Sequence, residues 1–182
     1  MGTKNSIYNF PILIYIFLIS VFFVFSYGSK TLNAAPENEA ACNFVKNDLL
    51  RLKIVKSEYT LYVMKGDETI RKYPVAVGRN PGQKERSGDN RTPEGSFEVS
   101  QIQNSTGWVH DFRDGKGMIN GAYGPWFIRL KTPWKGIGIH GTHDPDSIGK
   151  DITEGCIRLK NTDMRELKEN YIRMLMKVLI SK

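Results

Sequence analysis

Apolar residues follow two patterns along the chain, one continuous run near the N-terminus and many short stretches after residue 51. The run covers residues 10–27 and carries no charged side chain. An apolar segment at the start of a chain is typical of an export signal or a membrane anchor, and its 18 residues fit either. A buried core helix is a poorer interpretation because the run has no polar face. We therefore expect a signal peptide or anchor helix over residues 1–28, and a protein exported to the periplasm or cell envelope.

The remaining chain changes texture at Leu52. Residues 29–51 are rich in small and polar side chains, which predicts a spacer with a short helix over 43–51. From Leu52 onward, β-branched and aromatic residues alternate with turn sequences. They predict strands at 52–56, 59–64, 70–77, 96–102, 126–130, 137–139 and 174–180, the first three as an antiparallel meander.

Helical signals are confined to the segment after Leu159. Asn161 or Thr162 offers an N-cap, and Met164 and Leu167 fall on one helical face. The expected architecture is one mainly β domain with one or two short helices, preceded by the apolar N-terminal helix. Residues 52–182 are long enough for one core of this kind and too short for two ordinary domains.

Two polar stretches separate the predicted strands. Residues 79–91 contain no aliphatic or aromatic side chain. Residues 104–124 are polar and Gly-rich but include Trp108, Met118 and Tyr123, which favours a folded loop over a linker. We expect both stretches to be surface loops that frame the functional site.

The charge balance narrows the choice of partner. The formal net charge of +7 falls only to +6 when the single charge of Lys4 is removed with residues 1–28. A basic surface favours an anionic polymer such as a cell wall, although a soluble protein can carry such a surface without any specific partner. Nucleic acid is not expected, because no basic run is interleaved with aromatics and an exported chain rarely meets it.

A thiol and an imidazole in one segment suggest the chemistry. His140 precedes Cys156 by sixteen positions, and it ends an apolar stretch at the rim of a predicted sheet. An imidazole that accepts the proton of a thiol makes it a nucleophile and later returns the proton to a leaving group. Gly155 permits a tight turn that aims backbone N–H groups at an oxyanion, and Arg158 places a cation nearby. The segment predicts nucleophilic catalysis by Cys156 with His140 as the base.

Other interpretations of these residues are less favourable. A zinc site built from His140, His143 and Cys156 would need helical spacing between the histidines, which Gly141 opposes, so neither a metal nor another cofactor is expected. The acidic side chains between His140 and Cys156 indicate a solvated loop rather than paired-carboxylate catalysis. His110 and His143 are expected to be solvated loop residues.

Two further residues bear on the thiol. The carboxylate of Glu154, two positions before Cys156, would raise the pKa of the thiol, so we expect its side chain to point outward. Cys42 could form a disulfide with Cys156 in an exported chain. Because Cys156 has the setting of a nucleophile, we expect two free thiols instead.

Four segments of the chain occur in the order and spacing of a known family. They are 73–78 (YPVAVG), 92–97 (TPEGSF), 139–142 (IHGT), and 147–149 (SIG) together with 155–159 (GCIRL). In these segments the chain resembles the catalytic domain of the L,D-transpeptidases, also called the YkuD domain, from about Leu52 to Ile180. The resemblance implies a β-sandwich-like catalytic fold.

The resemblance also implies an activity. In this family a cysteine, here Cys156, attacks the bond before the terminal D-Ala of a peptidoglycan tetrapeptide stem, and His140 would move the proton. D-Ala leaves, and the acyl group passes to the amine of another stem as a 3–3 cross-link, to an envelope-protein amine, or to water. The implied oxyanion and substrate contacts are Gly155, Arg158, Thr142 and Thr153.

One departure from the family leaves the choice of acceptor open. Many members have Ser/Thr-His-Gly-Cys at the nucleophile, whereas this chain has Glu154 in place of the histidine. An L,D-carboxypeptidase or cross-link hydrolase would use the same site with water as the acceptor. A non-catalytic wall-binding module is the alternative from another class, and it predicts a buried, unreactive thiol. The expected partners are stem peptides and, in one alternative, an envelope protein, with residues 10–27 as a candidate membrane anchor.

Overall fold

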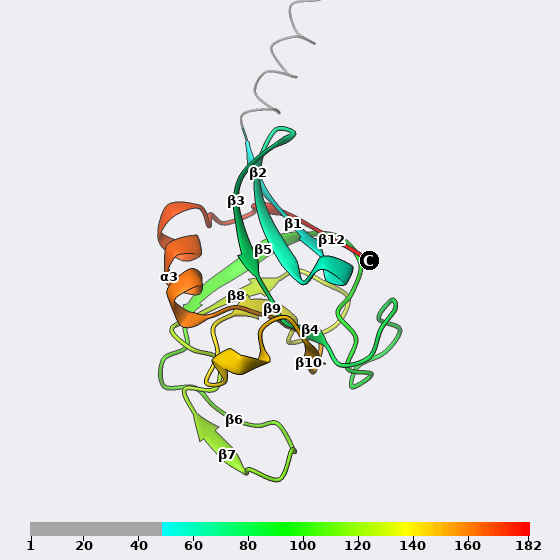
Figure 1. The fold of residues 1–182 in the computed structure, drawn as a ribbon, viewed down its shortest axis with the longest axis vertical. Helices are drawn as coiled ribbons and strands as arrows, with labels where there is room; N and C mark the ends of the chain where they lie inside the picture. Colours follow the sequence, from blue (N-terminus) through cyan, green and yellow to red (C-terminus); the bar gives the residue numbers. More distant parts are fainter. Residues whose placement is uncertain (1–48) are drawn as a thin grey trace, which may run out of the picture. The chain divides into compact units, whose positions relative to one another are not determined.

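An eight-stranded sheet is the framework of residues 49–182, the part of the chain that the computed structural model describes. Its strands run in the order β11-β9-β8-β5-β12-β1-β2-β3 (Figure 1). Two small sheets, β10 with β4 and β6 with β7, accompany it. The prediction of a mainly β domain is confirmed. The predicted signal or anchor segment, most of the spacer and Cys42 lie outside the described residues.

The elements have the following bounds. The strands are β1 (Leu50–Val55), β2 (Thr60–Lys65), β3 (Glu68–Pro74), β4 (Val77–Gly78), β5 (Gly95–Asn104), β6 (Val109–Asp111), β7 (Met118–Asn120), β8 (Trp126–Leu130), β9 (Gly138–His140), β10 (Asp151–Thr153), β11 (Ile157–Arg158) and β12 (Lys177–Ser181). The helices are η1 (Lys56–Glu58), η2 (Pro145–Ser147) and α3 (Asn161–Asn170). In residues 49–182, no helix combines the length and the apolar character that a membrane crossing requires.

The C-terminal strand joins the two halves of the sheet. Strands β1, β2 and β3 form the predicted antiparallel meander. Strand β12 lies between β1 and β5, parallel to the first and antiparallel to the second. It therefore connects the meander to β5, β8, β9 and β11, the half of the sheet that carries His140 and Cys156.

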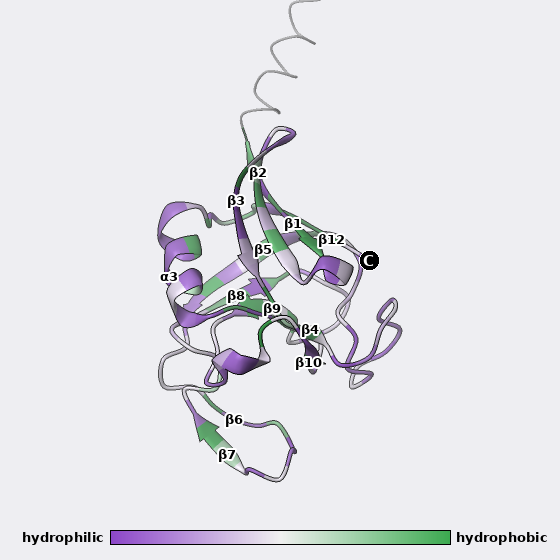
Figure 2. Ribbon diagram, in the orientation of Figure 1, coloured by the Kyte–Doolittle hydropathy of each residue, from purple (hydrophilic) through white to green (hydrophobic). Residues whose placement is uncertain are grey.

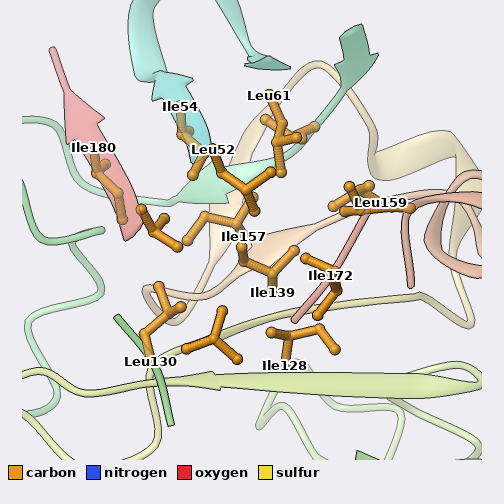
Figure 3. Packing of buried hydrophobic residues seen from close by; sticks show 14 of the residues in the cluster. Leu52, Ile54, Leu61, Ile128, Leu130, Ile139, Ile157, Leu159, Ile172 and Ile180 are labelled. Atoms are coloured by element: carbon orange, nitrogen blue, oxygen red, sulfur yellow. The ribbon is translucent and has the colours of Figure 1, made fainter. Parts of the chain in front are cut away.

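One aliphatic core lies against the sheet, and its packing decides where the polar residues of β9 and β11 point (Figure 3). Ile139 of β9 and Ile157 of β11 are fully buried in it and face each other across a parallel pair. Burial of each such side chain stabilises the fold by about 1.5–3 kcal/mol. Because successive residues of a strand point to opposite faces, His140 and Arg158 lie on the face away from Ile139 and Ile157.

Hydropathy follows the same division. Figure 2 shows hydrophobic colour on parts of β1, β2, β8, β9 and β12, whereas β3, the outside of α3 and the loop between β4 and β5 are mainly hydrophilic in colour. Two buried residues of α3, Met164 and Leu167, close the core on one side of the sheet, as the sequence predicts. The apolar face of this short helix is thus used for packing.

Three predicted boundaries are wrong. Leu50 and Arg51 begin strand β1, so the predicted helix over 43–51 does not reach them. The predicted strand 70–77 divides into β3 and β4, because after Pro74 the chain leaves the meander and Ala76 pairs with Arg158. The last strand begins at Lys177 rather than residue 174, since Leu175 adopts a left-handed conformation that ends regular pairing.

Two other details differ from the sequence prediction. The stretch 104–124 contains an antiparallel hairpin, β6–β7, rather than loop alone. Helix α3 has Lys160 at its N-cap without a side-chain hydrogen bond. The Asn161 side chain instead accepts a hydrogen bond from the N–H of Thr142 (2.8 Å), which ties the start of the helix to the loop after β9.

Candidate active site

The end of the β9–β11 pair brings the predicted dyad to one cavity. Arg158 lies opposite His140 in the parallel register, and Cys156 immediately precedes β11. His140, Cys156 and Arg158 all line a cavity of about 540 Å³. Its walls also include Thr153 and Glu154. The loop after β4 and the β6–β7 hairpin supply the other sides, so both predicted loops frame the cavity.

His140 is held as a neutral base. Its ring is buried, stacked on Phe127 with the ring centroids 5.4 Å apart, and in edge contact with Tyr123. Nδ1 lies 2.6 Å from the carbonyl oxygen of Gly141. Because a carbonyl only accepts, Nδ1 carries the proton and Nε2 keeps its lone pair. Burial, with the charge of Arg158, lowers the pKa of His140 to about 3, so the ring is neutral and can accept a proton at neutral pH.

Cys156 is a half-buried free thiol in this cavity. Sγ donates a hydrogen bond to the carbonyl oxygen of Gly136 (3.2 Å). Burial raises the pKa of the Cys156 thiol to about 11, with Glu154 adding to the rise, while the Gly138 amide and Arg158 oppose it. The thiol is therefore protonated at neutral pH and needs a base. Transfer of its proton to His140 requires Sγ to turn away from Gly136.

The turn before the nucleophile depends on Gly155. Its φ is +125°, a conformation that side chains rarely adopt, and a Cβ there would lie 2.7 Å from the carbonyl oxygen of Arg91. The N–H of Gly155 donates to Oγ1 of Thr153 (3.1 Å), which in turn donates to the carbonyl of Cys156 (2.6 Å). Gly155 and Thr153 thus shape the turn. The N–H of Cys156 has no acceptor in residues 49–182 and is therefore available to an oxyanion.

Arg158 is a buried cation without a carboxylate partner within hydrogen-bonding distance in the described residues. It is 4% exposed, and Nη1 donates to Oγ of Ser147 (3.0 Å). Its guanidinium lies over the ring of Phe112, 5.2 Å from the centroid. Nε is buried and has no hydrogen-bond partner in the part that the structure describes. A buried guanidinium with an unused donor is suited to bind a carboxylate.

Thr142 lies apart from the thiol. It is buried, and its hydroxyl accepts from the N–H of Asp144 (2.9 Å) and donates to the carbonyl oxygen of the same residue (3.0 Å). It lines a second cavity beside α3 rather than the one that contains Cys156. Among the predicted contact residues, the structure places Gly155, Arg158 and Thr153 beside Cys156, whereas Thr142 braces the loop after His140.

The β6–β7 hairpin contributes contacts that the sequence prediction missed. Nε2 of His110 lies 3.0 Å from Oε2 of Glu154, so the prediction of a merely solvated His110 is wrong. His143 is also in contact, because its ring stacks on Phe112 with the centroids 5.1 Å apart. Trp108, His110 and Phe112 alternate along the chain, and that period of two could have indicated a strand with one aromatic face.

The loop between β4 and β5 is organised by Asp89. Its carboxylate accepts a hydrogen bond from the ammonium of Lys84 (2.6 Å). It also accepts hydrogen bonds from the backbone N–H groups of Glu85, Arg86 and Arg91. Both side chains of the Lys84–Asp89 pair are largely buried. These bonds hold the pKa of Asp89 far below its usual range against the opposing effect of burial. One ionised carboxylate therefore fixes a wall of the cavity that has no apolar core.

The charges around the thiol are mainly positive. Arg79, Arg113 and Lys135 line the cavity with exposed side chains, in addition to buried Arg158. Glu154 and Asp111 are the acidic residues of its lining. Within residues 49–182, no group of three or more His, Cys, Asp or Glu side chains is arranged to hold a metal ion. The arrangement is suited to acyl transfer from an anionic peptide.

The family model and the similar proteins point to the same family. The model of the L,D-transpeptidase catalytic domain, YkuD, matches residues 50–180. A Bacillus licheniformis protein assigned as L,D-transpeptidase YkuD is 32% identical over 117 residues, which are 64% of this chain and 57% of that protein. The Bacillus subtilis YkuD is 32% identical over 108 residues, 59% of this chain and 52% of the relative. The chain thus spans little more than half the length of these relatives.

Solved structures share the fold. An L,D-transpeptidase from Mycobacterium smegmatis matches with a TM-score of 0.55 at 19% identity, over 73% of this chain and 58% of that one. L,D-transpeptidase 3 from Mycobacterium tuberculosis matches with a TM-score of 0.55 at 17% identity, over 73% and 61% of the two chains. At these low sequence identities, the similarity shows a shared fold alone.

Proposed function

Because the chain belongs to the L,D-transpeptidase catalytic-domain family, we propose that it is a cysteine acyltransferase that acts on peptidoglycan tetrapeptide stems. Its nucleophile would be Cys156 and its proton carrier His140. The observation that carries the proposal is the shared cavity of a thiol, a neutral imidazole with a free Nε2 and a buried guanidinium. The buried guanidinium of Arg158 distinguishes the site from a generic pair of a thiol and an imidazole.

Acylation follows from these groups. Nε2 of His140 takes the proton of the thiol, and Sγ of Cys156 attacks the carbonyl carbon of the bond before the terminal D-Ala. The N–H of Cys156 donates to the oxyanion of the tetrahedral intermediate. The C–N bond then breaks, the amine of D-Ala takes the proton back from Nε2, and a thioester at Cys156 remains.

Transfer reverses the same steps with a new nucleophile. An acceptor amine attacks the thioester carbon and gives its proton to Nε2 of His140. The C–S bond breaks, the thiolate of Cys156 regains the proton, and a new amide, the 3–3 cross-link, is released. Arg158 supports the choice of donor, because its unused Nε–H and positive charge suit a carboxylate of the stem.

The setting of the enzyme is part of the proposal. The apolar run of residues 10–27 supports export to the cell envelope, where the stems are, and it supports anchoring if it is retained. Exposed Arg79, Arg113 and Lys135 around the cavity support an anionic substrate.

Muropeptide products test this proposal. Purified protein incubated with tetrapeptide muropeptides should release D-Ala and form cross-linked dimers, which mass spectrometry separates from trimmed tripeptides. Replacement C156A should abolish both products, since no other described thiol lies in the cavity. Tripeptides without dimers would instead identify a carboxypeptidase that uses water. Product formation by C156A at the wild-type rate would refute a cysteine mechanism.

A further inference from the structure

A contact between the β6–β7 hairpin and the nucleophile segment has no part in the acyl-transfer steps. Nε2 of His110, in β6, lies 3.0 Å from Oε2 of Glu154. The hairpin projects beyond the end of the large sheet (Figure 1). His110 is far from Glu154 in sequence, so this bond joins two separate walls of the cavity.

Glu154 is the acidic residue closest in sequence to the thiol. Only Gly155 stands between Glu154 and Cys156, and both side chains line the same cavity. A carboxylate that turns toward Sγ opposes formation of the thiolate, because like charges repel. The Glu154 side chain is 43% exposed and is therefore free to rotate unless another group holds it.

His110 is well placed to hold that carboxylate. Its ring is in edge contact with Phe112, with centroids 4.5 Å apart, and also contacts Tyr123 at 5.4 Å. Phe112 is in turn fixed between His143 and the guanidinium of Arg158. The imidazole is therefore held by ring contacts and can donate from Nε2 to the carboxylate of Glu154.

We propose that His110 is a positioning residue that acts through Glu154: it fixes the carboxylate against the hairpin and so limits its repulsion of the Cys156 thiolate. The inference deepens the proposed function, because it assumes that Cys156 is the nucleophile. Other charged and titratable groups also face this part of the cavity, and they are the same in wild type, H110A, E154Q and the double variant. They are Arg79, Lys84, Asp111, Arg113, Tyr123, Arg129, Lys135, His140, His143 and Arg158.

The direction of the pKa shift at the thiol agrees with this role. Burial is the largest cause of the raised pKa of Cys156, and the charge of Glu154 adds to it. Burial, followed by the charges of Cys156 and Glu154, raises the pKa of Tyr123 to about 12. Glu154 thus acts electrostatically on the cavity even while it is bound to His110, and its release would strengthen that effect.

A double-mutant cycle on thiol alkylation tests the proposal without any substrate. Iodoacetamide alkylation at pH 8 is followed in wild type, H110A, E154Q and H110A/E154Q, each with C42S so that only Cys156 reacts. H110A should slow alkylation about threefold. That is the effect expected when the released carboxylate of Glu154 comes some ångströms closer to the Cys156 thiolate in a partly solvated site. E154Q should speed it, and H110A should have no effect when E154Q is present.

Two controls separate positioning from packing. H110Q keeps a side-chain N–H donor and should react at nearly the wild-type rate. H143A removes the other imidazole that packs on Phe112 but makes no bond to Glu154, so it should change the rate much less than H110A does. The proposal is overturned if H110A slows alkylation equally with Glu154 and with Gln at that position, if H143A matches H110A, or if H110A reacts like wild type. Because alkylation needs no stem peptide, an inactive transferase would not alter these outcomes.

Discussion

At the scale of single residues, the site depends on how burial sets protonation. His140 is surrounded by aromatic rings and stays neutral, while Cys156 keeps its proton until a base removes it. An imidazole that were protonated at neutral pH could not accept the thiol proton. The carbonyl of Gly141 completes the arrangement, because it fixes the tautomer that leaves Nε2 free.

The buried imidazole also predicts a pH dependence of folding. Its folded-state pKa of about 3 lies below the ordinary value of 6.5, so between these two pH values the unfolded chain binds a proton that the folded chain does not. The stability that comes from the neutral ring of His140 is fully present above pH 6.5 and is lost as the pH falls toward 3. Within that window the free energy of unfolding should fall by about 1.4 kcal/mol for each unit by which the pH is lowered.

Urea unfolding of wild type and H140Q between pH 4 and pH 7 measures this contribution. Other titrating groups affect both proteins alike, so the difference between the two curves isolates His140. The wild-type advantage should shrink as the pH falls below 6.5. Parallel curves over the whole range would mean that the ring is not held neutral.

The residues of the nucleophile segment are the easiest part of the site to predict from the sequence. Gly155, Cys156 and Arg158 lie within four consecutive residues, so strand β11 and the turn before it place them together without further information. The contact between His110 and Glu154 could not be predicted in the same way, because it depends on how the β6–β7 hairpin folds over the cavity. Asn161 is a similar case, since its side chain braces Thr142 instead of capping the helix.

At the scale of elements, the cavity is made by two loops with different means of support. The hairpin β6–β7 rests on aromatic contacts, whereas residues 79–91 of the loop between β4 and β5 have no aliphatic or aromatic side chain and are organised by Asp89. Strand patterns reveal the first half of the sheet because β-branched residues alternate there. They reveal neither the internal order of the polar loop nor the division of β3 from β4, which depends on the distant partner Arg158.

Removal of the Asp89 charge tests that loop. D89N should lower the free energy of unfolding by about 3 kcal/mol, because it leaves buried Lys84 without a counter-charge. D67N is the matched control, since Asp67 pairs with Arg51 at a fully exposed position, and it should have almost no effect. Guanidinium unfolding of both variants decides the matter. Equal, small effects would show that the loop does not depend on Asp89.

At the scale of the whole molecule, the topology brings the chemistry together. The C-terminal strand β12 lies in the middle of the sheet, next to β1, and this parallel pairing of the two ends of the domain has no local signature in sequence. The pairing of β9 with β11 joins residues that are closer in sequence but likewise not neighbours, and the family resemblance implied its result. The match of the family model to residues 50–180 confirms that resemblance.

The central claim is that Cys156 carries the acyl group, and intact-mass spectrometry of the protein mixed with a tetrapeptide stem tests it most directly. Wild type quenched in acid should gain the mass of the stem less D-Ala, and proteolysis should locate the adduct on the peptide that contains Cys156. H140Q should form the adduct much more slowly, and C156A should form none. An adduct on another residue, or full turnover by C156A, would contradict the account.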